Sequence, residues 1–150
     1  MRRASARGNL PLTPEETLRL WSDVDRWPNF VEGYARRLEL TERWPEPGGR
    51  VVWESTPDGR GRVTETVTDN STERFATQVF EKALIGTQTL RAVPASDGTE
   101  VELSLDYELA RYGPLRGLAD ALFIRRALRD ALRRTLFRFS VEAEEEAGLR

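Results

Sequence analysis

Residues 99–109 constrain the fold more than any other stretch, because apolar and polar side chains alternate along them without interruption. The apolar set is Val101, Leu103, Leu105, Tyr107 and Leu109, and the intervening set is Glu100, Glu102, Ser104, Asp106 and Glu108. A period of two is typical of a β-strand that buries one face and leaves the other in water. A sheet made of such strands needs a second layer of structure over its apolar face.

Turn residues divide the preceding sequence into further strands. Strands are predicted at residues 36–44, 50–56, 62–68, 74–81 and 84–93, and a short edge strand is expected at residues 2–9. The segments between them are rich in Pro, Gly, Asp, Asn and Ser, which favour tight turns. Consecutive strands joined by tight turns predict an antiparallel sheet.

Two short helical segments are predicted near the N-terminus. Thr13 is expected to cap a helix over residues 14–22, because a proline follows it and Glu16 completes a capping box. Asp25 is expected to cap a second short turn over residues 25–30.

The C-terminal part of the chain is predicted to form one long helix over residues 115–143, which begins after a Gly-Pro pair. Its apolar positions recur at helical spacing and form one stripe: Ala121, Ile124, Leu128, Ala131, Leu132, Thr135, Leu136 and Phe139. This helix is expected to cover the apolar face of the sheet. The acidic segment 142–146 lies where the helix dipole disfavours negative charge, so the end of the helix is expected to fray.

The composition excludes several kinds of chemistry. The 150 residues include no Cys and no His, which excludes disulfides, thiolate nucleophiles, Ser-His-Asp catalysis and metal sites with Cys or His ligands. The net charge of −2 argues against a dedicated nucleic-acid binder. We find no apolar run long enough for a transmembrane helix, and we expect no signal peptide. A single domain over residues 1–150, located in the cytoplasm, is expected.

Four segments carry a family resemblance: residues 21–30 (WSDVDRWPNF), 86–90 (GTQTL), 113–115 (GPL) and 132–136 (LRRTL). On these segments and on the order of its elements, the chain resembles the SRPBCC superfamily, also called START-like, and within it the polyketide cyclase/dehydrase type. The resemblance implies an α+β helix-grip fold, in which a curved antiparallel sheet of about seven strands wraps around the long C-terminal helix. It also implies a deep apolar cavity between the sheet and that helix. Members of the superfamily include lipid carriers, aromatic polyketide cyclases and quinone-binding proteins.

Glu65 is the most informative candidate for chemistry. It shares one side of its predicted strand with Val63 and Val67, so it faces the interior if the valines do. Burial would disfavour the charged form of the carboxyl group, which could then act as a general acid or base. The alternative is that Glu65 is solvated or paired with an arginine, and the rarity of buried glutamate without a partner favours this alternative.

Other candidates lie on predicted inward positions of the strands. Gln88 could hydrogen-bond a ligand oxygen or a neighbouring backbone group, and Gly86 either opens space or marks a bulge. The aromatic rings of Trp53 and Tyr107 suit a flat ligand, but ordinary core packing explains each of them more simply. The predicted ligand-binding set is Trp53, Ser55, Thr77, Gly86, Gln88, Leu103, Leu105, Leu128 and Leu132, with Glu65 and Tyr107 as candidate catalytic residues.

The predicted long helix carries a row of arginines, Arg125, Arg129 and Arg133, with further arginines beside it. Such a row could meet an anionic headgroup, a membrane surface or nucleic acid. A solvated flank, with some arginines paired to acids of the first helices, explains the row more simply, because no aromatic residue interleaves on it. Asp23 and Asp25 are too few ligands for a calcium cage, and no metal site is expected.

The sequence therefore predicts a protein that binds a hydrophobic small molecule, such as an aromatic polyketide, a lipid or a quinone-like compound. An alternative is a cyclase/dehydrase enzyme in which Glu65 and Tyr107 transfer protons. A weaker alternative is a regulatory protein that binds a partner through the outer sheet or the arginine-rich helix. We expect no cofactor, no nucleic acid and no integral membrane association, and a monomer or weak homodimer. Convergence of Glu65, Gln88 and Tyr107 on one cavity would favour the enzyme.

Overall fold

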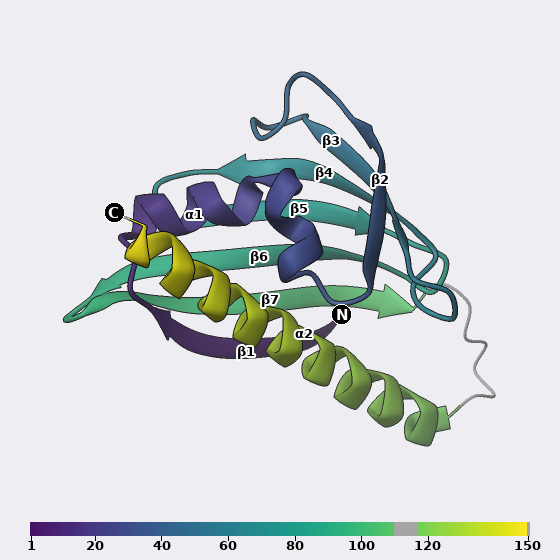
Figure 1. Cartoon of the computed structure of the whole chain (residues 1–150). Helices are drawn as coiled ribbons and strands as arrows, with labels where there is room; N and C mark the ends of the chain where they lie inside the picture. Colours follow the sequence, from purple (N-terminus) through teal and green to yellow (C-terminus); the bar gives the residue numbers. More distant parts are fainter. Residues whose placement is uncertain (110–116, 150) are drawn as a thin grey trace.

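A computed structural model of the chain describes residues 1–109 and 117–149. Within these residues, seven strands form one antiparallel sheet in the order β1-β7-β6-β5-β4-β3-β2 (Figure 1). The strands are β1 (Arg2–Leu10), β2 (Tyr34–Leu40), β3 (Arg50–Ser55), β4 (Arg62–Asn70), β5 (Arg74–Phe80), β6 (Leu84–Ala95) and β7 (Gly98–Leu109). The helices are α1 (Pro14–Ser22), the 3₁₀ helix η1 (Val24–Asn29) and α2 (Gly117–Gly148).

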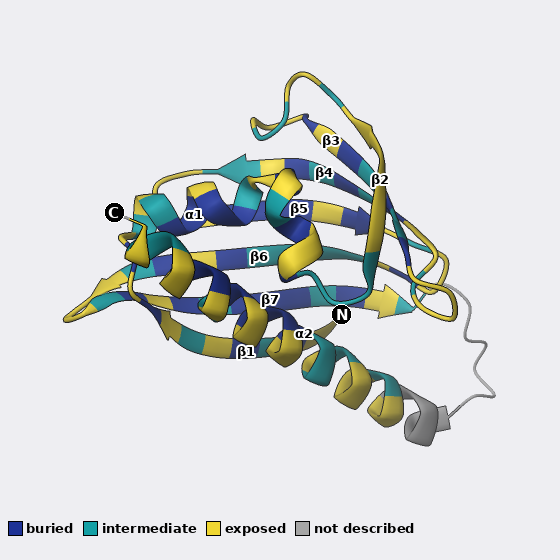
Figure 2. Ribbon diagram, viewed as in Figure 1, coloured by how far each residue is buried: buried dark blue, intermediate teal, exposed yellow. Residues whose placement is uncertain are grey.

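The three helices lie on one face of the curved sheet, which confirms the predicted helix-grip fold (Figure 1). The hydrophobic core lies between the two layers, and buried positions recur along the central strands and along the side of α2 that faces them (Figure 2). The alternation predicted for β7 is confirmed, because Val101, Leu103, Leu105 and Tyr107 are all buried. The sheet thus presents one apolar face to the helices.

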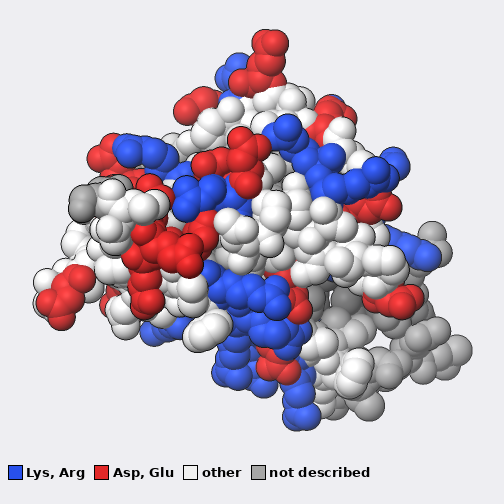
Figure 3. Space-filling model, viewed as in Figure 1, with Lys and Arg blue, Asp and Glu red and all other residues white. Residues whose placement is uncertain are grey.

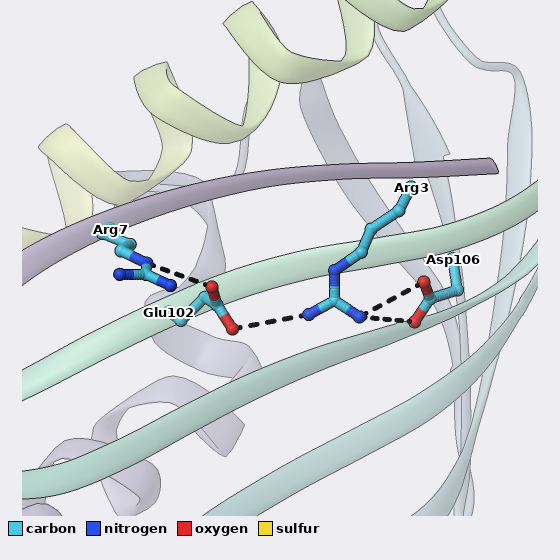
Figure 4. A network of polar contacts seen from close by, with 4 residues as sticks. All are labelled: Arg3, Arg7, Glu102 and Asp106. Carbon is cyan, nitrogen blue, oxygen red and sulfur yellow. Dashed lines mark hydrogen bonds and ion pairs between the residues drawn. The ribbon is translucent and has the colours of Figure 1, made fainter.

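Ion pairs join the polar face of β7 to the edge strand β1 (Figure 4). Arg3 donates to Asp106 and to Glu102 at 3.4 Å, and Arg7 donates to Glu102 at 3.1 Å. Both arginines are exposed, so these pairs add little stability, but they offset the acidic row of β7. Ser104 departs from the predicted polar face, since it is buried where β1 pairs with β7.

The predicted capping box of α1 is confirmed. The Thr13 hydroxyl accepts a hydrogen bond from the Glu16 backbone N–H at 3.2 Å, and the Glu16 carboxylate accepts one from the Thr13 N–H at 2.9 Å. The prediction that Asp25 caps the next turn is wrong. Asp23 caps η1, and its carboxylate accepts from the backbone N–H of Asp25 at 3.1 Å. The reason is that α1 ends at Ser22, so Asp23 is the first residue free to cap the following turn.

Several strand boundaries differ from the predicted ones, by one to four residues. β2 ends at Leu40, because Trp44 turns inward and its indole N–H donates to the carbonyl oxygen of Ser22 at 2.8 Å. β4 continues to Asn70 through the predicted break, because a bulge after Val67 keeps it paired with β5. The bulge lets polar turn-forming residues stay in the sheet.

The end of α2 is ordered by a buried carboxylate, so the prediction that its acidic end frays is wrong. Glu142 is 5% exposed and accepts hydrogen bonds from Arg26 Nε at 2.7 Å and from Asn29 Nδ2 at 2.8 Å. Arg26 also reaches Glu146 at 3.1 Å. Burial alone would raise the pKa of Glu142, but the hydrogen bonds from Asn29 and Arg26 and the Arg26 charge outweigh it and lower the pKa. These contacts tie α2 to η1.

The predicted apolar stripe of α2 faces the sheet over the C-terminal half of the helix. Its buried members are Leu132, Thr135, Leu136 and Phe139, and its half-buried members are Ile124, Leu128 and Ala131. The predicted helix start at residues 113–115 lies outside the described residues, as does the side chain of Ala121. None of the described helices is both long and apolar enough to cross a membrane.

Candidate functional site

A cavity of about 270 Å³ lies between the sheet, η1 and α2. The loop between β3 and β4, residues 56–60, forms one side of it. The apolar lining comes from Trp21, Trp27, Val31, Pro57, Leu105, Leu128, Ala131 and Leu132, and the polar lining comes from Glu32, Ser55, Thr56, Asp58, Arg60, Glu65, Gln88 and Thr135. A largely apolar cavity with a few polar groups is typical of a small-molecule site.

Glu65 supplies a buried carboxyl group to this cavity. It is 4% exposed, and it lies on the inward side of β4 between Val63 and Val67. Its Oε2 accepts a hydrogen bond from the indole N–H of Trp53 at 2.8 Å, and its Oε1 accepts one from the Thr77 hydroxyl at 2.9 Å. Since β3 and β5 flank β4, their inward side chains reach the carboxyl group from both sides.

The surroundings of Glu65 favour its neutral form. Burial raises the pKa of the carboxyl group, and the hydrogen bond from Trp53, the charge of Arg60 and the hydrogen bond from Thr77 oppose that rise without cancelling it. Among the described residues, Glu65 forms no ion pair. The alternative that the sequence favoured, a solvated or arginine-paired Glu65, is therefore wrong, because neutral donors on the neighbouring strands take the place of a cation.

Arg60 lines the cavity beside this group and was missed by the sequence prediction. Its guanidinium carbon lies 5.2 Å from the centre of the Trp53 ring, and it forms an ion pair with the buried side chain of Glu81. Trp53 therefore contacts the cation through its ring face and Glu65 through its N–H. The turn at residues 57–59 was predicted as a hairpin, but nothing in its composition indicates that the arginine after it folds back over the sheet.

Gln88 reaches the same cavity from β6. It is half-buried and lies in register with Thr77 on β5 and Leu105 on β7. Within the part of the chain that the structure describes, its side-chain amide has no hydrogen-bond partner, so the predicted alternative of a bond to neighbouring backbone is not found. An unpartnered amide in a cavity wall is available to a ligand oxygen.

Tyr107 is not among the residues that line this cavity. It is fully buried on β7, and its hydroxyl has no partner among the described residues. Burial raises the pKa of Tyr107, and the charges of Arg2 and Arg125 oppose the rise. Gly86 on β6 does not open space, because a Cβ there would lie 2.4 Å from the Asp106 carbonyl oxygen.

The other predicted site residues divide into two groups. Ser55, Leu105, Leu128 and Leu132 line the cavity, whereas Trp53, Thr77 and Leu103 do not, and the first two of these hold Glu65 instead. The Ser55 hydroxyl is engaged by its own loop, since it donates to the Thr56 carbonyl at 2.9 Å and accepts from the Gly61 N–H at 2.8 Å.

The sequence prediction missed several lining residues besides Arg60: Trp21, Trp27, Val31, Ala131 and Thr135. The two tryptophans belong to the segment that carried the family resemblance, which was the available signal for them. In the described residues, no group of acidic side chains is arranged to hold a metal ion. Asp23 caps η1, and Asp25 pairs with Arg37 at 3.3 Å.

Comparison with known sequences identifies one matching family. A family model described as "Polyketide cyclase / dehydrase and lipid transport" matches residues 1–144. Comparison with the sequences of curated proteins found no match.

Solved structures provide similar folds. The di-domain ARO/CYC StfQ from the steffimycin biosynthetic pathway has a TM-score of 0.78 and 17% identity, over 97% of this chain and 51% of StfQ, so this chain spans about half of that protein. A START superfamily protein from Mycobacterium smegmatis has a TM-score of 0.75 and 13% identity, over 95% of this chain and 97% of that one. Zhui aromatase/cyclase from a Streptomyces species has a TM-score of 0.71 and 15% identity, over 97% and 95% of the two chains. At these identities the likeness concerns the fold.

Proposed function

Because the chain belongs to the polyketide cyclase/dehydrase and lipid transport family, we propose that it binds a small, largely apolar molecule in the cavity between the sheet and α2. The observation that carries this proposal is the position of Glu65. Its carboxyl group is buried, is held by Trp53 and Thr77 instead of a cation, and lines a cavity whose other walls are mostly apolar. Such a polar group fixes the orientation of an apolar ligand.

The polar groups of the cavity indicate the chemistry of the ligand. When protonated, the Glu65 carboxyl group donates one hydrogen bond, and the amide of Gln88 both donates and accepts. Glu65 and Gln88 together suit a ligand that carries a carbonyl or hydroxyl oxygen on an apolar body. Ligand pockets typically measure about 300–1,000 Å³, so a cavity of about 270 Å³ suits a compact ring system or one end of a larger molecule.

The same carboxyl group supports a second candidate function, a cyclase or dehydrase. A carboxyl group whose pKa is raised by burial can protonate a ligand oxygen and later take a proton back, which is general acid–base catalysis. The aromatase/cyclase named Zhui and the ARO/CYC StfQ share the fold, which adds to this candidate. Since Tyr107 is not among the lining residues of this cavity, the enzymatic proposal rests on Glu65 alone.

Ligand-dependent melting tests the proposal. The protein is heated with long-chain fatty acids, quinones or flat polycyclic phenols, and binding to the folded state raises the melting temperature. We expect at least one of these classes to stabilise the protein, and the absence of any shift across all three would contradict ligand binding.

The variant Glu65→Gln separates the carrier from the enzyme, with Glu100→Gln on the exposed face of β7 as the matched control. A carrier keeps its ligand affinity within a few-fold in Glu65→Gln, because the amide still forms hydrogen bonds. An enzyme keeps binding but loses roughly 10²–10⁴-fold in turnover. Turnover that survives in Glu65→Gln would remove Glu65 from the mechanism.

A further inference from the structure

The side of α2 that faces away from the cavity carries large apolar side chains in water. Phe123 is 73% exposed and Phe137 is 70% exposed, whereas Leu128 and Leu132 on the other side line the cavity. A single exposed apolar residue needs no explanation, but Leu122, which is 55% exposed, lies next to Phe123, and Phe137 lies on the same side of the helix. Phe123 and Phe137 are 14 residues apart in the sequence. They therefore lie on the same side of the helix, about 21 Å from each other along its axis.

Arginines lie between the two phenylalanines on the same side. At 3.6 residues per turn, one face of α2 carries both phenylalanines and several charged residues, and we call it the outer face of α2: Leu122, Phe123, Arg126, Arg129, Asp130, Arg133 and Phe137. No aromatic residue interleaves within the row Arg125, Arg129 and Arg133, but Phe137 follows Arg133 by four residues and so extends the row by one turn. Figure 3 shows basic side chains gathered over the middle of α2 and acidic ones near its C-terminal end.

The charges of the outer face are largely free. Among the described residues, Arg126 and Arg129 have no ion-pair partner, and Arg133 has a weak one in Asp130 at 4.0 Å. Two neighbouring arginines are paired, because Arg134 and Arg138 both form ion pairs with Glu32, at 3.0 and 2.7 Å. Residues 122–137 contain five arginines and one aspartate, so this stretch is strongly cationic in a protein whose net charge is −2.

We propose that the outer face of α2 docks on an anionic lipid surface. A helix that lies flat on a membrane inserts aromatic side chains from one face and places arginines beside lipid headgroups, which is the arrangement found here. A second copy of the chain fits less well, because a two-fold contact would bring the same arginines against one another. The acidic end of α2 limits the docking surface to the stretch from Phe123 to Phe137.

Docking of this kind leaves the cavity unobstructed. The cavity lies against Leu128, Ala131 and Leu132, on the opposite side of α2 from the outer face. The proposal is independent of the proposed ligand, and its variants lie outside the cavity. Failure of membrane docking and failure of ligand binding can therefore be measured separately.

Vesicle sedimentation tests the proposal. The protein is mixed with vesicles of phosphatidylcholine alone or of phosphatidylcholine with phosphatidylglycerol, and the bound fraction is measured at low and high salt. We expect binding to the anionic vesicles, weak binding to the neutral ones, and loss of binding as salt rises. Absence of sedimentation with the anionic vesicles at low salt overturns the proposal.

Charge and apolar variants locate the contact. Arg126→Glu with Arg129→Glu is expected to lower binding at least about tenfold, and Phe123→Ser with Phe137→Ser is expected to weaken it as well. The matched control, Arg62→Glu with Arg91→Glu, makes the same charge change at exposed positions on β4 and β6. This control is expected to bind the anionic vesicles at least about tenfold more tightly than the α2 charge variant.

Two results would overturn the assignment to this face. One is that the α2 and control charge variants lose binding equally, since the effect would then come from net charge. The other is a concentration-dependent dimer, seen without vesicles by analytical ultracentrifugation, that Phe123→Ser with Phe137→Ser dissociates. That result would make the outer face a contact between copies of the chain. Melting with an apolar ligand in the absence of vesicles then reports separately on the cavity.

Discussion

The carboxyl group of Glu65 links the stability of the fold to pH in the direction opposite to that of most carboxylates. Its pKa in the folded protein is raised above the value in the unfolded chain, chiefly by burial. The folded state therefore holds the proton more tightly. The stabilisation that this gives is fully present below the ordinary carboxyl pKa and is lost as pH rises through the raised pKa.

Replacing Glu65 by Gln removes this titration. We expect the wild type to lose stability relative to Glu65→Gln as pH rises from the ordinary carboxyl pKa through the raised one, because burying a charge costs more than burying an amide. Urea unfolding of both proteins from acid to neutral pH measures the difference in their free energies of unfolding. The contributions of the other carboxyl groups are the same in both proteins and cancel in this difference. A difference that stays constant with pH, or that favours the wild type more at higher pH, would contradict the environment described for Glu65.

The contact between η1 and α2 depends on the Glu142 carboxylate. The pKa of Glu142 is lowered, so its stabilisation is present above the ordinary carboxyl pKa and is lost as pH falls through the lowered value. We expect Glu142→Gln to reduce the free energy of unfolding by about 1.5–3 kcal/mol near neutral pH, because Arg26 and Asn29 lose a charged acceptor. Chemical denaturation measures this loss.

The exposed residue Glu144 provides the control for that substitution. Glu144→Gln changes the same charge two residues away and is expected to stay within about 0.5 kcal/mol of the wild type. Equal losses for the two variants would show that the charge of the α2 end, and not the contact with η1, matters for stability.

The pairing of β6 with β7 requires a residue without a side chain at position 86. A Cβ on Gly86 would meet the carbonyl oxygen of Asp106 at 2.4 Å, so one strand must shift in Gly86→Ala. We expect a loss of about 1–3 kcal/mol in the free energy of unfolding. Gly148→Ala near the end of α2, where a Cβ meets nothing within 4 Å, is expected to cause no loss. Similar stability of Gly86→Ala and the wild type would contradict the described strand approach.

Local signals in the sequence predicted the secondary structure well, and they failed where a distant residue decides the outcome. The alternation of residues 99–109 and the turn residues between the other strands identify the strands without tertiary information. By contrast, β2 ends early because Trp44 bonds to the end of α1, and α2 continues because Arg26 neutralises Glu142. Neither partner is close in sequence, so helix-dipole and strand-length arguments could not anticipate them.

The candidate site was predictable to a smaller extent than the fold. The period of two in residues 62–68 placed Glu65 beside the inward-facing valines, but the sequence alone favoured a partner of opposite charge. The neutral donors Trp53 and Thr77 lie on different strands, and their meeting at Glu65 depends on the register of the whole sheet. The cavity wall formed by the loop of residues 56–60 depends on how that loop folds back, which composition does not specify.

The function proposed for the whole molecule requires the cavity to be a binding site, and native mass spectrometry of protein purified from its own host tests this most directly. Ala131→Trp places a large ring on a residue that lines the cavity, and Ala127→Trp places the same ring on an exposed position of the same helix. We predict that the wild type and Ala127→Trp retain a bound small molecule of the same mass and that Ala131→Trp retains none. A wild type that carries no ligand, or a folded Ala131→Trp that carries the same ligand, would contradict the account.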